Sequence, residues 1–287
     1  ECPHMAGLEY TLAGPTLRAD DYTLVALTGG AVEPKVNGKH VNMFEPLLLA
    51  PGDTLEIGML VSGLRGYLAV FGGFDIHPVL GSRSTDLKCH IGGLNGRALK
   101  AGDVLPVLRA FELPQERFRP LQKRVRAAAL EDWALTTLTP HGFIGAQKFP
   151  LLRVVLGPQD EMFSEKGLFD FKSALYTVTQ DSNRMASKLN GAAIEARAGV
   201  DILSDGIVEG SVQISANGQP IVMLTDHQST GGYAKIATVI PCDIPTLAQV
   251  RPGQLVGFRV VTVEEGTAAC KKEKDKWAYL KEKIDHD

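Results

Sequence analysis

The sequence lacks the features that mark several common classes of protein. Only four of its 287 residues are cysteine, and it has neither a CxxC pair nor an HExxH motif, so neither a disulfide framework nor a zinc site is predicted. It has no apolar run of about 18 residues, the length that a membrane span requires, and no visible signal peptide. The sparse cysteines fit a reducing cytosol, which predicts a cytoplasmic protein.

An excess of one charge is also missing. The net charge is −3, so the chain has no electrostatic reason to bind nucleic acid or anionic lipid. No P-loop, dinucleotide fingerprint or Ser-His-Asp set is recognisable, and no metal site is expected. The chain begins Glu1-Cys2-Pro3 rather than with Met, which predicts a fragment or a part of something longer.

Short β-branched runs punctuated by glycine, proline and asparagine dominate the sequence and predict a mainly β fold. Asn37-Gly38 suits the positive φ angles of a type I′ hairpin turn. Three turns, at residues 50–53, 100–103 and 251–254, share a glycine at the third position, which favours type II geometry. Strands are expected at residues 22–27, 47–49, 54–60, 66–71, 211–215, 220–225, 236–240 and 255–263.

The recurrence of these turns predicts two β-barrel-like units with few short helices. The units are expected at residues 1–111 and 150–264, joined by a charged linker, 112–149, with a short helix near 125–135. Helices are expected at 164–172, capped by Ser164, and at 245–250. Residues 265–287 predict a C-terminal helix, whose apolar stripe of Trp277, Leu280 and Ile284 is expected to dock on the barrel through Trp277.

Three glycine-punctuated blocks carry more information than composition does. They contain GSRST at residues 81–85 and GGLNGR at 92–97, then SNRM at 182–185, and finally GQPI at 218–221 and DHQSTGGY at 226–233. In this order they resemble the allophanate-hydrolase-subunit-2 family, from about Ala6 to Val263. That family includes the C subunit of 5-oxoprolinase and the corresponding half of the urea carboxylase carboxyltransferase domain. Departures from its pattern are Ala186, Ser229, Ala234 and a missing opening Thr-x-x-Gln-Asp-x-Gly-Arg segment.

The resemblance implies a cyclophilin-like barrel that works in a hetero-oligomer. It implies a subunit-1-type partner, called the B subunit, and, for an oxoprolinase, a third and larger one, the A subunit. The implied activity is the ATP-dependent opening of 5-oxoproline to glutamate, with ATP used by the assembled complex. Because the chain has no recognisable nucleotide motif or triad, it is predicted to be inactive alone.

The candidate site centres on residues 226–235, where polar groups follow an apolar strand. Gly231 and Gly232 would let backbone donors approach a ligand closely, as an anion nest. Arg184 is the predicted carboxylate ligand, because guanidinium grips carboxylate through two parallel hydrogen bonds; a salt bridge to an acidic neighbour is its alternative. The predicted catalytic residues are Asp226, Gln228, Thr230, Tyr233 and Lys235. Further substrate-binding candidates, each with internal bracing as its alternative role, are Gln213, Gln249, Arg83 and Ser82.

Two other functions stay open. In a carboxyltransferase that moves CO₂ from carboxybiotin to a urea-like amide, the same donors would stabilise the ureido oxyanion of biotin. Biotin is an expected cofactor only in that case. The third possibility is a non-catalytic partner of a kinase-inhibitor protein.

Overall fold

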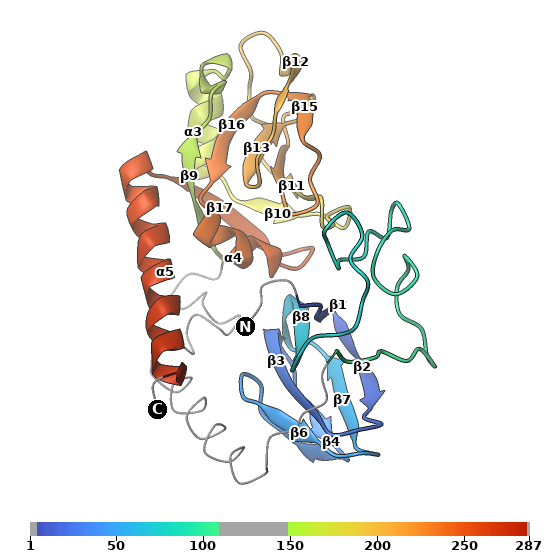
Figure 1. The fold of residues 1–287 in the computed structure, drawn as a ribbon. Helices are drawn as coiled ribbons and strands as arrows, with labels where there is room; N and C mark the ends of the chain where they lie inside the picture. Colours follow the sequence, from blue (N-terminus) through green and yellow to red (C-terminus); the bar gives the residue numbers. More distant parts are fainter. Residues whose placement is uncertain (1–4, 109–148, 286–287) are drawn as a thin grey trace. The chain divides into compact units, whose positions relative to one another are not determined.

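The computed structural model describes residues 5–108 and 149–285 (Figure 1). It divides into two compact units, Glu1–Pro140 and His141–His286. Both are built mainly from strands, which confirms the predicted fold class. Almost all of the predicted linker, 112–149, and its helix near 125–135 lie outside the described residues, so the predicted domain boundaries stay a prediction.

The N-terminal unit contains two four-stranded antiparallel sheets. The first has the order β1 (Leu8–Thr11), β8 (Ser62–Val70), β3 (Thr23–Ala31) and β6 (Leu47–Leu49). The second has the order β2 (Ala13–Arg18), β7 (Thr54–Met59), β4 (Lys35–Val36) and β5 (Lys39–His40). Apolar residues of both sheets, among them Leu27, Leu55 and Leu68, belong to one buried cluster, so the sheets share a core. Alternating burial along β1 and β6 is typical of strands with one covered face.

The predicted turns are present. Asn37 and Gly38 have φ angles of 50° and 77°, as the type I′ turn between β4 and β5 requires. In the three recurring turns, the third-position glycines have φ angles close to 90° and the fourth residue donates its backbone N–H to the first carbonyl. These glycines are Gly52, Gly102 and Gly253.

The C-terminal unit is a closed seven-stranded barrel, which confirms the barrel expected there. Its strand order is β10 (Tyr176–Val178), β11 (Ala186–Asn190), β14 (Pro220–Met223), β13 (Ser211–Ile214), β16 (Lys235–Val239), β9 (Leu151–Leu156) and β17 (Leu255–Val260). All neighbours are antiparallel except β9 and β17, which run parallel. The interior is filled by side chains with no exposed surface, including Val212, Ile214 and Val222.

The strand directions assign each loop to one rim of the barrel. Because β13 is antiparallel to both β14 and β16, these two strands end at the same rim. By the same pairings β11, β9 and β17 begin there. We call it the Arg184 rim, after the residue that precedes β11 by two positions. A two-stranded ribbon, β12 (Asp201–Gly206) with β15 (Thr230–Tyr233), forms a separate sheet in this unit.

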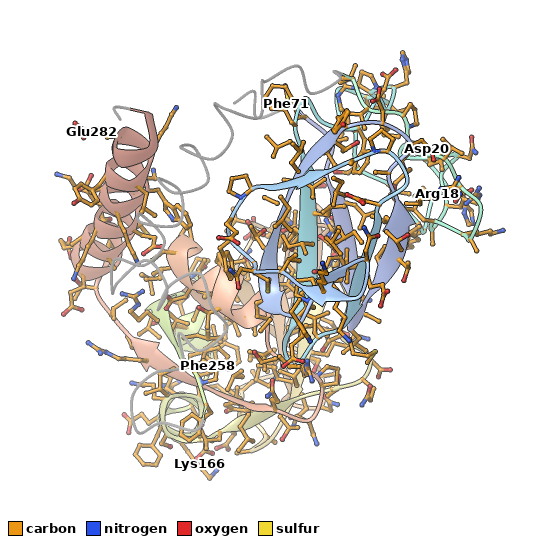
Figure 2. All side chains as sticks on the ribbon, turned by 90° about the horizontal axis from the view of Figure 1, so that it is seen from below. Arg18, Asp20, Phe71, Lys166, Phe258 and Glu282 are labelled. Carbon is orange, nitrogen blue, oxygen red and sulfur yellow. The ribbon has the colours of Figure 1, made fainter. Side chains whose placement is uncertain are left out.

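Short helices complete the barrel unit. Helix α3 (Glu165–Ser173) is capped as predicted, since Ser164 Oγ accepts a hydrogen bond from the Gly167 N–H at 3.0 Å. Its Phe171 ring stacks on Phe258 of β17, with centroids 4.5 Å apart. Figure 2 shows Phe258 inside this unit and Lys166 at its surface. The remaining short elements are η2 (Asp160–Met162), η3 (Pro241–Asp243) and α4 (Ile244–Ala248).

Helix α5 (Val263–Asp285) is present, but the prediction that Trp277 docks it is wrong. Trp277 is 47% exposed, whereas the helix contacts β9 and η3. Near the start of α5, a side chain at Gly266 would lie 3.1 Å from Ile240 Cγ2, so the helix approaches the barrel closely at a residue without a side chain. Leu280, from the same predicted stripe, is buried at 7% exposed, so the stripe is covered in part, but not at Trp277. None of the helices in the described ranges is both long and apolar enough to cross a membrane.

Candidate functional site

Arg184 and Asp226 form an ion pair at the Arg184 rim. Asp226 follows β14, and its backbone N–H donates to the Arg184 carbonyl at 3.0 Å. Arg184 donates from Nε to Asp226 Oδ2 at 2.8 Å and from Nη2 to Oδ1 at 3.3 Å. Both side chains are about two-fifths exposed, at 40% and 43%, so the pair is accessible to a ligand. The salt bridge foreseen as the alternative for Arg184 therefore forms, with a residue predicted to belong to the same site.

The loop between β14 and β15 is polar and accessible. Its Gln228 is exposed, and the Gln228 carbonyl lies 2.7 Å from His227 Nδ1. Thr225 Oγ1 donates to Glu209 Oε1 at 2.7 Å. The Leu224 N–H donates to the carbonyl of Met185, which ties this loop to the segment that carries Arg184. Two chain segments thus bring hydroxyl, amide, carboxylate and guanidinium groups to one rim.

Gly231 and Gly232 do not form the expected nest. They lie in β15, and the N–H groups of successive residues in an extended strand point in opposite directions. A Cβ at Gly231 would lie 2.5 Å from Ile207 Cδ1 and 2.7 Å from Gln213 Nε2. Gly231 therefore allows the ribbon to pack closely, instead of offering a converging pair of donors.

Gln213 and Tyr233 brace this packing. Gln213 is 2% exposed, and its Nε2 donates to the Tyr233 carbonyl at 3.2 Å. Tyr233 is half-buried, whereas Thr230, at the other end of β15, is exposed. The internal role foreseen for Gln213 is thus its observed contact.

Lys235 is buried, unlike Asp226 and Gln228. Its side chain is 6% exposed, and its Nζ donates to Asp205 Oδ2 at 2.5 Å and to the Gly206 carbonyl at 3.0 Å. The hydrogen bond from Lys235, followed by that from the Gly206 N–H, lowers the pKa of the Asp205 carboxyl. Gln159 completes the cluster, because its Oε1 accepts from the Lys235 N–H at 3.1 Å. Lys235 therefore fastens the end of β12 to the first residue of β16.

From the sequence, neither Asp205 nor Gln159 was predicted to belong to this cluster. Asp205 lies in the stretch Ser204-Asp205-Gly206-Ile207, another polar segment punctuated by glycine, so a sequence signal was available. Gln159 is 76 residues from Lys235 in sequence, and nothing near it indicates the contact.

The remaining candidates lie elsewhere. Arg83 Nη1 donates to the Ile76 carbonyl, and Ser82 Oγ accepts from the Ser84 N–H at 3.1 Å. Both belong to the N-terminal unit, where they brace their turn. Gln249 follows α4 and precedes β17, which assigns it to the Arg184 rim, and it is partly buried.

A cavity of about 630 Å³ opens in the N-terminal unit, and none of the predicted site residues lines it. Apolar side chains such as Leu24, Val70 and Phe71 line it, with Arg18 and Asp20 at its polar edge. Figure 2 labels Arg18, Asp20 and Phe71 in this unit. The wall includes Val107, close in sequence to residues outside the described ranges. Within residues 5–108 and 149–285, no three His, Cys, Asp or Glu side chains are grouped to hold a metal ion.

Comparison with known proteins extends the evidence beyond this geometry. A model of the carboxyltransferase domain, subdomain A and B, matches residues 1–260. The C subunit of 5-oxoprolinase from Escherichia coli is 34% identical over 275 residues, which cover 96% of this chain and 80% of that protein. Its counterpart from Haemophilus influenzae is 31% identical over 272 residues, covering 94% and 79%. The solved structure of Kluyveromyces lactis urea carboxylase superposes with a TM-score of 0.79 at 27% identity, covering 98% of this chain and 24% of that one.

These similarities confirm the resemblance that the motif order indicated. The match spans both units and includes the barrel whose Arg184 rim carries the polar groups. The chain therefore belongs to the family of carboxyltransferase domains, subdomains A and B.

Proposed function

We propose that this chain is the C subunit of an ATP-dependent 5-oxoprolinase, which opens 5-oxoproline to glutamate together with partner subunits. The observation that carries the proposal is the extent of similarity. Two 5-oxoprolinase C subunits match nearly the whole chain, and the match covers about four-fifths of each of them. In the urea carboxylase structure the match covers only 24% of the longer chain.

The chemistry of a lactam explains why such an enzyme would need several components. Opening the amide of 5-oxoproline is unfavourable near neutral pH, so ATP must activate the amide carbonyl by phosphorylation. Because this chain has no recognisable nucleotide motif, the proposal assigns ATP binding to the large partner and the subunit-1-type partner. This chain would contribute recognition groups and part of the wall of the site.

The Arg184 rim is the proposed contribution of this chain. Arg184 would bind the substrate carboxylate, with Asp226 holding the guanidinium plane through the hydrogen bonds at 2.8 and 3.3 Å. Gln228 and Gln249 carry amides that both donate and accept, which suits a lactam. Thr230 and Tyr233 belong to the adjoining ribbon.

Lys235 has a supporting role in this proposal. Its buried ammonium holds the end of the ribbon through Asp205 and Gly206, so it positions residues of the site instead of meeting the substrate. Arg83 and Ser82 stay predicted substrate-binding residues, although their observed contacts brace a turn.

Reconstitution of the complex tests the proposal. The chain is co-expressed with the large partner and the subunit-1-type partner encoded by neighbouring genes, and glutamate release from 5-oxoproline is measured with and without ATP. We expect release only when all three proteins and ATP are present. Full activity of the two partners without this chain would contradict the proposal.

The second candidate is a carboxyltransferase acting on a urea-like amide. The TM-score of 0.79 with urea carboxylase favours it, because the same fold serves in a carboxylase. Avidin discriminates between the candidates, since it sequesters biotin. Glutamate release that persists with avidin supports the oxoprolinase. Avidin-sensitive carboxylation of urea, without glutamate release, supports the carboxyltransferase. If the chain is instead a non-catalytic partner, substitutions at the Arg184 rim should change neither reaction.

A further inference from the structure

Two cysteines from distant parts of the chain lie side by side in the barrel unit. Cys242 belongs to η3, which follows β16 at the Arg184 rim, and Cys270 belongs to α5. Their Sγ atoms are 3.3 Å apart. Both thiols are free and partly buried. The two thiols meet where α5 contacts the barrel, and neither cysteine is a predicted site residue.

Both sulfurs stand on well-anchored elements. Asp243, the neighbour of Cys242, accepts hydrogen bonds from the backbone N–H of Arg153 at 2.8 Å and from its Nε at 3.0 Å. One turn before Cys270, Gly266 packs against Ile240. A disulfide bond is about 2.05 Å long, so the sulfurs, now 3.3 Å apart, need to approach by only ~1.3 Å to bond.

We propose that Cys242 and Cys270 form a reversible disulfide, by exchange with a low-molecular-weight disulfide such as oxidised glutathione, that fastens α5 to the barrel. In the first step, a cysteine thiolate attacks one sulfur of the oxidant, whose S–S bond breaks and releases one thiolate. In the second step, the other cysteine thiolate attacks the mixed disulfide and releases the second. The two cysteines are oxidised, the oxidant is reduced to two thiols, and the two cysteine protons end on those thiols.

The surroundings of Cys242 indicate the order of these steps. Burial raises the pKa of Cys242 to about 12, so this thiol is protonated near neutral pH and a poor first nucleophile. The first attack is therefore assigned to Cys270. The Arg153 Nη2 lies 3.5 Å from Cys242 Sγ, and its charge would stabilise the thiolate that completes the bridge.

The bridge would have a defined mechanical consequence. The chain between Cys242 and Cys270 contains β17, the strand that closes the barrel against β9 and β10. A disulfide would therefore enclose the closing strand in a covalent loop and prevent α5 from leaving the barrel. This inference does not depend on the identity of the substrate.

Mass spectrometry of a variant with two thiols tests the proposal. The C2S/C89S chain is incubated with oxidised glutathione, quenched with acid and digested without reduction. We expect the chain to lose the mass of two hydrogens and to yield a peptide pair joined through Cys242 and Cys270, both reversed by dithiothreitol. Stable glutathione adducts on both cysteines, or no reaction under conditions that modify the exposed Cys89 of the parent chain, would overturn the proposal.

Limited proteolysis tests the fastening of α5. The segment after Cys270 is rich in exposed lysines, including Lys271, Lys272 and Lys274, which trypsin cleaves once the helix opens. In the oxidised C2S/C89S chain, cleavage there is expected to be slower by at least about fivefold, because proteolysis follows the population of the opened state. Matched controls with C242S or C270S added should show no change on oxidation. Equal cleavage of the oxidised and reduced chains would exclude a bridge that restrains α5.

Discussion

At the scale of single residues, Arg184 and Asp226 contact each other and are both accessible to solvent. Their contribution to activity can therefore be measured separately from their contribution to stability. Arg184→Ala or Asp226→Ala should lower turnover of the assembled complex by at least about tenfold, roughly 1.4 kcal/mol in the barrier. The melting temperature should change little, because an exposed ion pair contributes at most about 1 kcal/mol. Asp201→Ala, at an exposed position of β12, is the control and should behave as the unchanged protein. Full activity with a strongly lowered melting temperature would show that the pair only braces the rim.

Asp205 and Lys235 predict an asymmetric response, because only the lysine is buried. Asp205→Ala leaves an ammonium that is 6% exposed without its carboxylate, whereas Lys235→Met leaves a carboxylate that is 53% exposed. A buried unpaired charge costs more than a solvated one, so Asp205→Ala should lower the melting temperature further than Lys235→Met. A larger loss from Lys235→Met would contradict this account.

The same pair predicts a pH dependence with a definite sign. The pKa of Asp205 is lowered in the folded chain, so its contribution is complete above the ordinary carboxyl pKa, about 3.9. The contribution is lost as pH falls through the lowered value. Urea unfolding of the parent chain and of Asp205→Ala should therefore differ most near neutral pH and converge in acid. A difference that grows on acidification would rule out the pair as its source.

At the scale of secondary-structure elements, one of two adjacent glycines in β15 determines how closely the ribbon of β12 and β15 packs. A Cβ at Gly231 would lie 2.5 Å from Ile207 Cδ1, whereas one at Gly232 would lie 3.6 Å from the nearest atom, the Ile202 carbonyl oxygen. Gly231→Ala should reduce the free energy of unfolding by about 1–3 kcal/mol through overpacking, and Gly232→Ala should change it little. Chemical denaturation of both variants makes the comparison. Equal effects would mean that the ribbon is not packed as described.

Asp243 ties η3 to β9 through three donors of Arg153. Asp243→Ala leaves a partly buried guanidinium and a backbone N–H without their acceptor, and should cost about 2 kcal/mol of stability. Hydrogen exchange should then increase in η3 and in the first residues of β9. Unchanged exchange at these elements would contradict the assigned role of Asp243.

Local chemistry explains which elements the sequence could predict. The Asn37-Gly38 turn and the Ser164 cap depend on neighbouring residues, and both were correctly foreseen. The ribbon strand β12 was missed, because Asp201–Gly206 is almost wholly exposed and shows no apolar alternation. The polar residue types of the candidate site were predictable, but the contact between Lys235 and Asp205 joins positions 30 residues apart. The sequence is limited in the same way at Trp277, since an apolar stripe on a helix does not reveal which other residues pack against it.

The whole molecule has separate hydrophobic cores in its two units. Ile214→Ala, in the barrel, should cost about 2–5 kcal/mol as a buried large-to-small change. We expect faster hydrogen exchange in β13, β14 and β16, with protection of β3 and β8 retained. The reciprocal Leu27→Ala should loosen β3 and β8 alone. Loss of protection throughout the chain in either variant would show that the two units unfold as one.

The parallel pairing of β9 with β17 has a consequence for the newborn chain. These neighbours are the first and last strands of the barrel in sequence, whereas every strand of the N-terminal sheets is made before either of them. A ribosome synthesises the N-terminal unit first, and that unit can fold while the rest is still being made. The barrel must wait, with the edges of β9 and β10 uncovered, until β17 has emerged. If translation ends before β17 is synthesised, the released chain has two unpaired strand edges, which are a template for aggregation.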